Sequence, residues 1–586
     1  MSLLSLSYIL FLIIGMIVYY SIPKKGQWIV LLLMGVFFYA QNTPKGSVFL
    51  LFSMVTAFLY GRYCDKLQDG KLQVRKVQGR TLEGSKQQRS NIQKSKQQCS
   101  DIQKSKQQRS NIQESKQQRS NVQESKQQHS NIQKSKQQDS NIQSDILRES
   151  QLQDEEKNIS QEASGLSETE SQQQAQRKKK WMLVLTISLN VLILLVLKVF
   201  LKIPFVSGYV GQRLGMLIPL GISFYTLQII AYMVDVYRGK IQPEKNLFRF
   251  ALFVSFFPQI LQGPIPRYDK LAPQFEKAHK FDYILFTDSL MLMLWGYFQK
   301  MVIADNAAIV VNRVFGEYQT YQGFYVVLAA FLYSIQLYAD FSGCVNIARG
   351  SAGLFGIQLE DNFNHPYFSH SIKEFWGRWH ISLSSFLKDY IYIPLGGNRK
   401  GKIRKYINLL LTFLVSGIWH GAGLTFLVWG FLHGMYQIIE DICKPWLTKL
   451  MNKLHINMEN FSFRFMLQIK TFVLAAVAWI FFRADSIKQA LSMLKSIITG
   501  WNPYVLFDES FYLLGLNGKE FRMLIFSIGI LWLVSFLQER MKLRETFRKQ
   551  NLLFQWSILL LGIFAVLIFG VYGPGYDATQ FIYGNF

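Results

Sequence analysis

The sequence predicts an all-α polytopic membrane protein, and three observations support this prediction. Hydrophobic residues make up 49% of the 586 residues and are concentrated in blocks separated by short polar joints. Many of these blocks approach the roughly 20 apolar residues that a helix needs to cross a bilayer core. Lysine and arginine residues flank the blocks, as is typical of loops at a membrane surface.

The apolar blocks predict about eleven transmembrane helices, with re-entrant or interfacial helices where a block is short. The expected helices cover residues 7–22, 27–40, 46–61, 181–200, 209–236, 283–303, 322–341, 406–419, 424–440, 465–483, 523–538 and 553–572.

The first block is expected to be a retained helix, not a removable signal peptide. Lys24 and Lys25 follow it, another apolar block comes next, and no small-residue cleavage site separates the two blocks. The four cysteines show neither a CxxC motif nor another metal-ligand spacing. We therefore expect no disulfide framework and no metal site.

A low-complexity insert covers residues 63–180 and separates N-terminal transmembrane helices (1–62) from a core (181–586). One ten-residue unit recurs in it, as in NIQKSKQQCS, DIQKSKQQRS and NIQESKQQRS. A unit with one aliphatic residue and no aromatic residue buries too little apolar surface to offset its conformational entropy. We expect a disordered tether, with a solvated or self-associating helix as the alternative.

The formal net charge of +26 comes mostly from residues beside the apolar blocks, because the insert holds 23 basic and 15 acidic residues. This distribution indicates anionic membrane lipid as a partner and argues against nucleic acid. Basic residues lie at both edges of the insert, Arg62 and Lys66 at its beginning and residues 177–180 at its end, and they predict a cytoplasmic insert and an external N-terminus. The basic segment 397–406 predicts a second cytoplasmic loop.

Residues 370–390, HSIKEFWGRWHISLSSFLKDY, predict one amphipathic helix at the membrane interface. Ser371 and Glu374 have the spacing of a capping box. Apolar side chains recur every three or four residues, at Ile372, Trp376, Trp379, Leu383, Phe386 and Tyr390. The opposite stripe carries Lys373, Gly377, His380, Ser384 and Lys388.

Five histidines fall within 69 consecutive positions: His365, His370, His380, His420 and His433. Ionisable groups at membrane depth are costly, so they are candidates for a functional cavity. A histidine whose hydrogen bonds are satisfied by a nearby backbone carbonyl is the alternative for each of them. We interpret His433, well along its helix, as a packing residue.

His420 has the most informative surroundings. One apolar block ends at Trp419, Gly421 and Gly423 permit close backbone approach, and the next block begins at Leu424. A helix break at membrane depth must be buried or line a cavity. A neutral imidazole there could act as a general base, and His380, beside Arg378, is the expected second member of the site.

Two further charges lie inside or beside apolar stretches, Asp340 and Arg267. They line a polar interior, or they form a structural ion pair or a helix-end contact, and we favour the structural alternative. Other chemistries lack their motifs, since the sequence has no GxSxG, Walker, HExxH or GxGxxG pattern in a suitable context.

Four segments together resemble the membrane-bound O-acyltransferase (MBOAT) family: GPIPRY, YADFSGCVNIARG, NFNHPYFSHSIKEFWGRWHISLSSFLKDYIYIPLGGNRKG and SGIWHGAGLTFLVWGFLHG. The resemblance is to the bacterial branch that contains alginate O-acetylation and teichoic-acid D-alanyl transfer proteins. It covers nearly all of the chain outside the insert and is densest over residues 362–434. It implies the MBOAT fold, with helices around a central tunnel, and acyl transfer from a cytoplasmic thioester towards an extracytoplasmic acceptor.

The resemblance assigns roles to individual residues. His420 matches the invariant histidine of the family, and His380 matches the histidine of the RWHISLS motif. In FIYGNF, Tyr583 is a candidate acyl relay, although Gly584 and Asn585 replace the usual Phe-Gln, and an interfacial anchor is the alternative. Residues that could line or support the tunnel are Arg378, Trp419, Asp340, Arg267, Asn364 and His365.

The resemblance also implies substrates and partners. FFRADSIKQA, after the block 465–483, resembles the alginate branch, which favours acetyl over D-alanyl. We expect acetyl-CoA or another acyl thioester or acyl carrier as donor, no bound cofactor, and an extracytoplasmic SGNH-type acetyltransferase partner for O-acetylation of a polysaccharide at the bacterial plasma membrane. The alternatives are D-alanyl transfer to teichoic acid from a carrier protein and a transporter gated by histidines.

Overall fold

The computed structural model describes residues 1–67, 172–197, 219–260 and 262–572, together with Lys94, Gln98, Ser105 and Glu170. The described parts fall into two compact units, one formed by Met1–Gly61 and Leu185–Phe586 and the other by Arg62–Val184. Most of the predicted insert lies outside the described residues. Its disorder and its cytoplasmic location therefore stay predictions.

The described residues are helical and contain no β-strand, which confirms the all-α class. The chain begins with α1 (Leu6–Ser21), α2 (Gln27–Asn42) and the helix Ser47–Leu67, followed after the gap by the helix Gln172–Leu197. Each of the last two helices contains residues of both units. The next helices are α6 (Ile222–Tyr237), α7 (Leu247–Ser255), α8 (Phe257–Ile260) and α9 (Tyr268–Glu276). The apolar blocks did not predict the short helices α7, α8 and α9.

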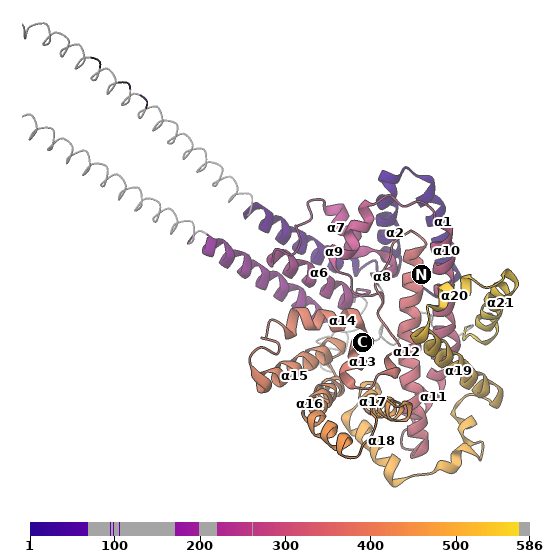
Figure 1. The fold of residues 1–586 in the computed structure, drawn as a ribbon. Coiled ribbons are helices and arrows are strands. Elements are labelled where there is room, and N and C mark those ends of the chain that lie inside the picture. Colours follow the sequence, from indigo (N-terminus) through magenta and orange to yellow (C-terminus); the bar gives the residue numbers. More distant parts are fainter. Residues whose placement is uncertain are drawn as a thin grey trace, which may run out of the picture. The chain divides into compact units, whose positions relative to one another are not determined.

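The helix α12 (Phe324–Gly353) is the main packing element of the first unit (Figure 1). It contacts α10 (Tyr283–Tyr297) and α11 (Asp305–Gly316), and 72% of its most apolar window is buried. A Cβ atom on Gly343 would lie 2.8 Å from the Gly296 carbonyl oxygen of α10. Such close backbone approach at small residues is typical of helix packing in membranes.

Between α10 and α11 the chain forms a π-helical segment, η3 (Phe298–Ala304). The wider turn is compatible with a buried charge, and π-helical turns occur most often at functional sites. This segment places Lys300 against α12.

The helices α15 (Gly401–His420) and α16 (Leu424–Lys453) form a tightly packed pair. A Cβ atom on Gly417 would lie 2.5 Å from the Phe426 carbonyl oxygen, and one on Gly430 would lie 2.4 Å from that of Phe413. Replacing either glycine would separate the two backbones.

The remaining helices are α17 (Phe461–Arg483), α18 (Ile487–Thr499), α19 (Gly518–Arg540), α20 (Leu543–Arg548) and α21 (Leu552–Phe569). Polar side chains cap the N-termini of several of these helices. The Asn517 side chain accepts from the Glu520 backbone N–H in a complete capping box at α19, and Asn551 caps α21.

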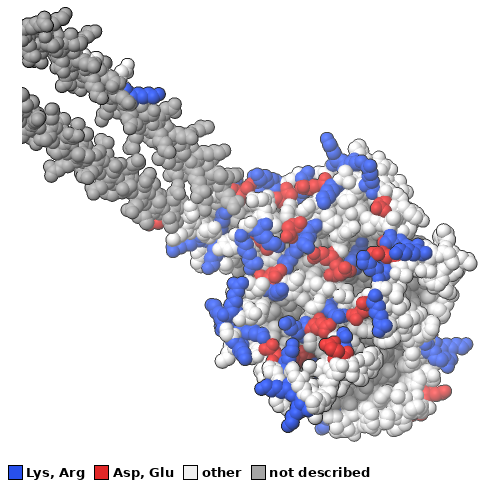
Figure 2. All heavy atoms as spheres, in the orientation of Figure 1, with Lys and Arg blue, Asp and Glu red and all other residues white. Residues whose placement is uncertain are grey.

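Six described helices are long and apolar enough to cross a membrane: Ser47–Leu67, Gln172–Leu197, Phe324–Gly353, Phe461–Arg483, Gly518–Arg540 and Leu552–Phe569. The apolar window of α21 has no buried residue, and Figure 2 shows its surface as almost free of charged side chains. Such a surface is expected to face lipid rather than water. These helices support the prediction of a polytopic membrane protein. The number of about eleven crossings and the central tunnel stay predictions.

The predicted single helix over 370–390 is wrong. The structure has α13 (Ile372–Arg378), a turn at Trp379 and His380, α14 (Ile381–Leu387) and a π-helical turn η5 (Lys388–Tyr392). His380 has φ 44° in the left-handed region, which ends α13 and starts α14. The Ser371 side chain caps α13 by accepting from the Glu374 N–H, but the Glu374 carboxylate accepts from the His370 N–H.

Candidate functional site

His420 is the last residue of α15 and is 1% exposed. Its ring centroid lies 4.8 Å from that of Trp419, 4.9 Å from that of Trp429 and 5.2 Å from that of Phe482. A Cβ atom at Gly421 would lie 2.4 Å from the Phe426 ring, so a side chain here would displace that ring. The structure thus has a helix break at His420, lined by aromatic rings.

His380 is completely buried. The prediction that it lies on the polar edge of an amphipathic helix is therefore wrong. The turn between α13 and α14 directs the residue into the interior, where its Nδ1 atom lies 3.2 Å from the Asn362 side-chain oxygen. The same oxygen accepts from the Ser382 backbone N–H at 3.0 Å and from its hydroxyl at 2.9 Å. Asn362 is therefore the residue that holds the His380 turn.

His380 and His420 both contact the indole ring of Trp419. The Trp419 ring centroid lies 6.3 Å from that of His380 and 4.8 Å from that of His420. The Trp419 indole N–H donates to the Ser223 carbonyl oxygen at 3.3 Å, which anchors this ring to α6. The two predicted catalytic histidines thus share one aromatic wall although they are 40 residues apart in the sequence.

A third histidine, His433, lies deeper along α16 and is also completely buried. Its Nδ1 atom accepts from the Trp376 indole N–H at 3.2 Å. Its ring centroid lies 5.2 Å from that of Trp429, the same ring that contacts His420. His433 therefore belongs to the aromatic surroundings of His420.

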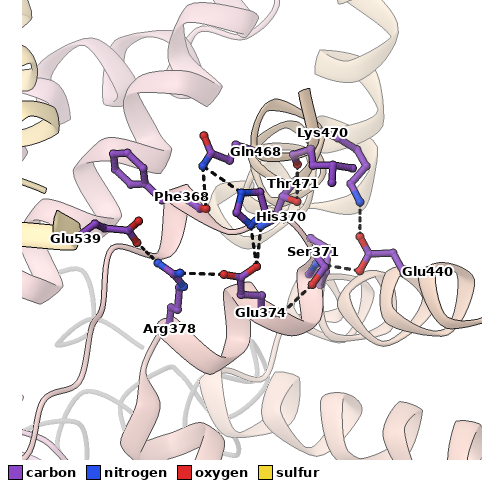
Figure 3. Close-up of polar contacts among 12 residues, drawn as sticks. Phe368, His370, Ser371, Glu374, Arg378, Glu440, Gln468, Lys470, Thr471 and Glu539 are labelled. Carbon is purple, nitrogen blue, oxygen red and sulfur yellow. Dashed lines mark hydrogen bonds and ion pairs between the residues drawn. The ribbon is translucent and has the colours of Figure 1, made fainter. Parts of the chain in front are cut away.

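Arg378 of α13 belongs to a polar cluster (Figure 3). Its guanidinium pairs with Glu374 of the same helix at 2.9 Å and with Glu539 of α19. Its carbonyl oxygen accepts from the Asn364 N–H at 2.9 Å. His365 follows with φ 45° and is half-buried. Arg378, Asn364 and His365, all predicted as tunnel-lining or supporting residues, thus lie beside the His380 turn.

Asp340 and Arg267 both form ion pairs. The Asp340 carboxylate, 1% exposed on α12, lies 2.5 Å from the ammonium of Lys300, which also lies 2.7 Å from Asp305. Arg267 pairs with Asp389 at 2.9 Å, and its guanidinium lies 4.5 Å from the Tyr390 ring centroid. Charge neutralisation accounts for the burial of these groups.

Tyr583 lies outside the described residues. Within the described ranges, no group of three histidine, cysteine, aspartate or glutamate residues could hold a metal ion. Sequence reasoning missed Asn362 and Trp429 as site residues and did not pair Glu539 with Arg378. Both Asn362 and Trp429 lie in the segments quoted for the resemblance, but neither is charged, and only the fold shows what they contact.

The fold and these buried histidines define a helical membrane protein with a histidine-containing aromatic interior. Residues 244–475 match the model of the MBOAT, membrane-bound O-acyltransferase family. This match confirms, over that part of the chain, the resemblance seen in the sequence. The matched range contains His380, His420 and His433.

Known proteins similar to the chain are named as O-acetylating or D-alanyl-transferring enzymes. The chain is 42% identical over 275 residues to the probable alginate O-acetylase AlgI of Pseudomonas syringae pv. tomato, covering 47% of this chain and 50% of that protein. It is 37% identical over 313 residues to the peptidoglycan O-acetyltransferase of Helicobacter pylori, covering 49% and 58%. It is 29% identical over 249 residues to the teichoic acid D-alanyltransferase of Bacillus subtilis, covering 39% and 60%. The matches span about half the length of the alginate O-acetylase relatives.

Proposed function

We propose that this chain is a membrane-bound O-acyltransferase that moves an acetyl group from a cytoplasmic thioester, acetyl-CoA, towards an extracytoplasmic polysaccharide. The observation that carries the proposal is the buried His420 at a helix break inside the range that matches the MBOAT family. The higher identity to O-acetylation proteins than to the D-alanyltransferase supports acetyl as the group transferred.

In this proposal His420 is the general base. Its neutral imidazole takes the proton of an incoming hydroxyl, whose oxygen then bonds to the thioester carbonyl carbon while the carbon–sulfur bond breaks. The imidazolium returns the proton to the leaving thiolate, so charge and atoms balance. His380 orients the thioester or stabilises the charge that develops on its oxygen.

The remaining parts of the proposal concern access and partners. The donor reaches His420 through a central tunnel formed by about eleven crossings, in a plasma membrane with the insert 63–180 in the cytoplasm. The accepting hydroxyl belongs to an SGNH-type partner outside the membrane or to Tyr583 as a relay. The other tunnel-lining candidates, including Asn364 and His365, support this path.

The test is the acetyl content of the cell-surface glycan in cells that carry His420→Ala or His420→Gln at wild-type protein level. We expect loss of acetylation by about 100-fold or more, because general-base catalysis contributes at least that much. His455→Ala, at an exposed histidine after α16, is the matched control and should acetylate normally. Acetylation at the wild-type rate in both His420 variants would disprove the assignment.

A D-alanyl transferase fed by a carrier protein is the second candidate, favoured only by the 29% identity to the Bacillus subtilis protein. Donor choice separates the two functions. Membranes given labelled acetyl-CoA should label a glycan or a partner under the first proposal. Under the second, only a D-alanyl carrier would transfer label.

A further inference from the structure

His433 is fixed by its hydrogen bond to Trp376. An indole N–H can only donate, so the Nδ1 atom of His433 must be the acceptor in the 3.2 Å contact. A neutral imidazole that accepts at Nδ1 carries its proton on Nε2. An imidazolium would donate from both nitrogens and would lose this bond. His433 is therefore held as a neutral ring with an Nε2–H donor, and it is unsuited to carry a proton in the reaction.

The Nε2–H group of His433 is completely buried and has no hydrogen-bond partner among the described residues. The same holds for the indole N–H of Trp429. A buried donor without an acceptor is unfavourable, and native proteins contain few of them. Trp429 contacts both His420 and His433, so these two donors near His420 are available to a ligand that brings an acceptor atom.

The surroundings restrict the chemistry of this ligand. The rings in contact with His433 are all aromatic, and only that of Tyr436 carries a hydroxyl; the others belong to Phe375, Trp376, Phe413, Trp429 and Trp479. A water molecule needs two to four polar partners, and a ligand hydroxyl brings a proton that needs its own acceptor. A carbonyl oxygen accepts without donating, so it suits a site of this kind.

We propose that the Nε2–H of His433 donates to a carbonyl oxygen of the acyl donor, beside His420. This inference depends on the proposed acyl transfer from a pantetheine thioester. Such a donor carries a thioester carbonyl and amide carbonyls on its arm, both of the required chemistry. Both imidazoles lie against Trp429, with centroid distances of 4.9 Å for His420 and 5.2 Å for His433. His433 is a binding residue, and His420 remains the base.

Two substitutions distinguish the roles of the two ring nitrogens of His433. His433→Gln places an amide N–H near the position of Nε2, whereas His433→Asn places an amide oxygen near that of Nδ1 and removes the donor. We expect His433→Asn to weaken donor binding about tenfold and His433→Gln to keep it within about threefold. A purely structural role through Trp376 predicts the reverse order. The same pair of substitutions at exposed His455 is the control and should leave binding unchanged.

The measurement is binding to the purified full-length chain in detergent, with coenzyme A and with acetonyl-coenzyme A as probes. The second probe replaces the thioester by a ketone and keeps its carbonyl. If His433→Asn weakens only acetonyl-coenzyme A, the bound oxygen is that of the acyl group. If it weakens both probes, the oxygen is an amide oxygen of the arm. If both His433 variants bind both probes as tightly as the wild type does, the proposal is overturned.

Trp376→Phe provides a second variant that keeps His433. Without the indole N–H, the proton of the imidazole is no longer fixed on Nε2, so binding should weaken severalfold. If both His433 variants fail to fold, this variant decides: unchanged affinity overturns the inference. Failure of the wild type to bind either probe would instead contradict the proposed coenzyme A donor, so the two failures are distinguishable.

Discussion

Arg378 at the end of α13 is paired with Glu539 near the end of α19, across 161 residues of sequence (Figure 3). Arg378 is two residues before His380, so this ion pair ties α19 to the turn that buries His380. Both side chains are partly exposed, at 23% and 30%. A pair of this kind contributes little to global stability, so its main effect should be on the position of His380.

Charge reversal tests this relationship. Arg378→Glu and Glu539→Arg should each lower acyl transfer by roughly tenfold, because small displacements of a catalytic group have large effects on rate. The double variant should recover most of the activity. The measurement is initial rate in membranes at matched protein levels. Reversing Lys542 and Glu545, an exposed pair on α20, is the control. If the double variant does not recover activity, the ion pair does not link α19 to the His380 turn as proposed.

Asn362 should be needed for both stability and activity. Its side-chain oxygen accepts two hydrogen bonds from Ser382 and contacts His380. Asn362→Ala leaves the buried Ser382 N–H unsatisfied, which should lower the free energy of unfolding by about 1–3 kcal/mol. Asn362→Asp keeps an acceptor oxygen and should retain more activity than Asn362→Ala. Thermal unfolding in detergent and transfer rate are the two measurements, and equal rates in both variants would argue against Asn362 holding the His380 turn.

The close packing of α15 and α16 should be sensitive to a single methyl group. Gly430→Ala would place Cβ 2.4 Å from the Phe413 carbonyl oxygen, so the helices must separate and His420 must move. Overpacking typically costs about 1–3 kcal/mol. Gly529→Ala in α19 is the matched control, since no atom lies within 4 Å of its Cβ position. A lower melting temperature is expected for the first variant alone.

The ion pair between Lys300 and Asp340 should be costly to break. Asp340→Ala removes the carboxylate that lies 2.5 Å from the ammonium of Lys300, whose pair with Asp305 at 2.7 Å is kept. Removing one member of a buried pair typically destabilises by about 3–5 kcal/mol. Asp340→Asn keeps the shape and should destabilise less than Asp340→Ala. A melting temperature for Asp340→Ala equal to that of the wild type would show that the pair is dispensable.

The helix break at His420 could be predicted from the sequence. Two glycines after an apolar block are a local signal, and α15 does end at His420, as α16 begins at Leu424. The beginning of α15 lies at Gly401 instead of residue 406 because lysine and arginine are good helix formers and extend the helix beyond its apolar part.

The turn at His380 could not be predicted in the same way. Trp379 and His380 are neither glycine nor proline, Gly377 lies inside α13, and the apolar spacing of residues 370–390 continues through the turn. The left-handed backbone at His380 is held by Asn362, 18 residues earlier, and a tertiary contact of this kind leaves no local pattern. The same reason explains why the partners of Asp340 and Arg378 were missed, since Lys300 and Glu539 lie 40 and 161 residues away.

The tryptophans between the buried histidines have a consequence for proton movement. Trp419 contacts both His380 and His420, and Trp429 contacts both His420 and His433. An indole ring has an N–H donor and no nitrogen that accepts a proton, so it cannot pass one between imidazoles. If the chain works as proposed, the two tryptophan rings prevent proton transfer between the histidines that they separate. The proton that His420 takes from the hydroxyl then stays on His420 until it is transferred to the leaving thiolate.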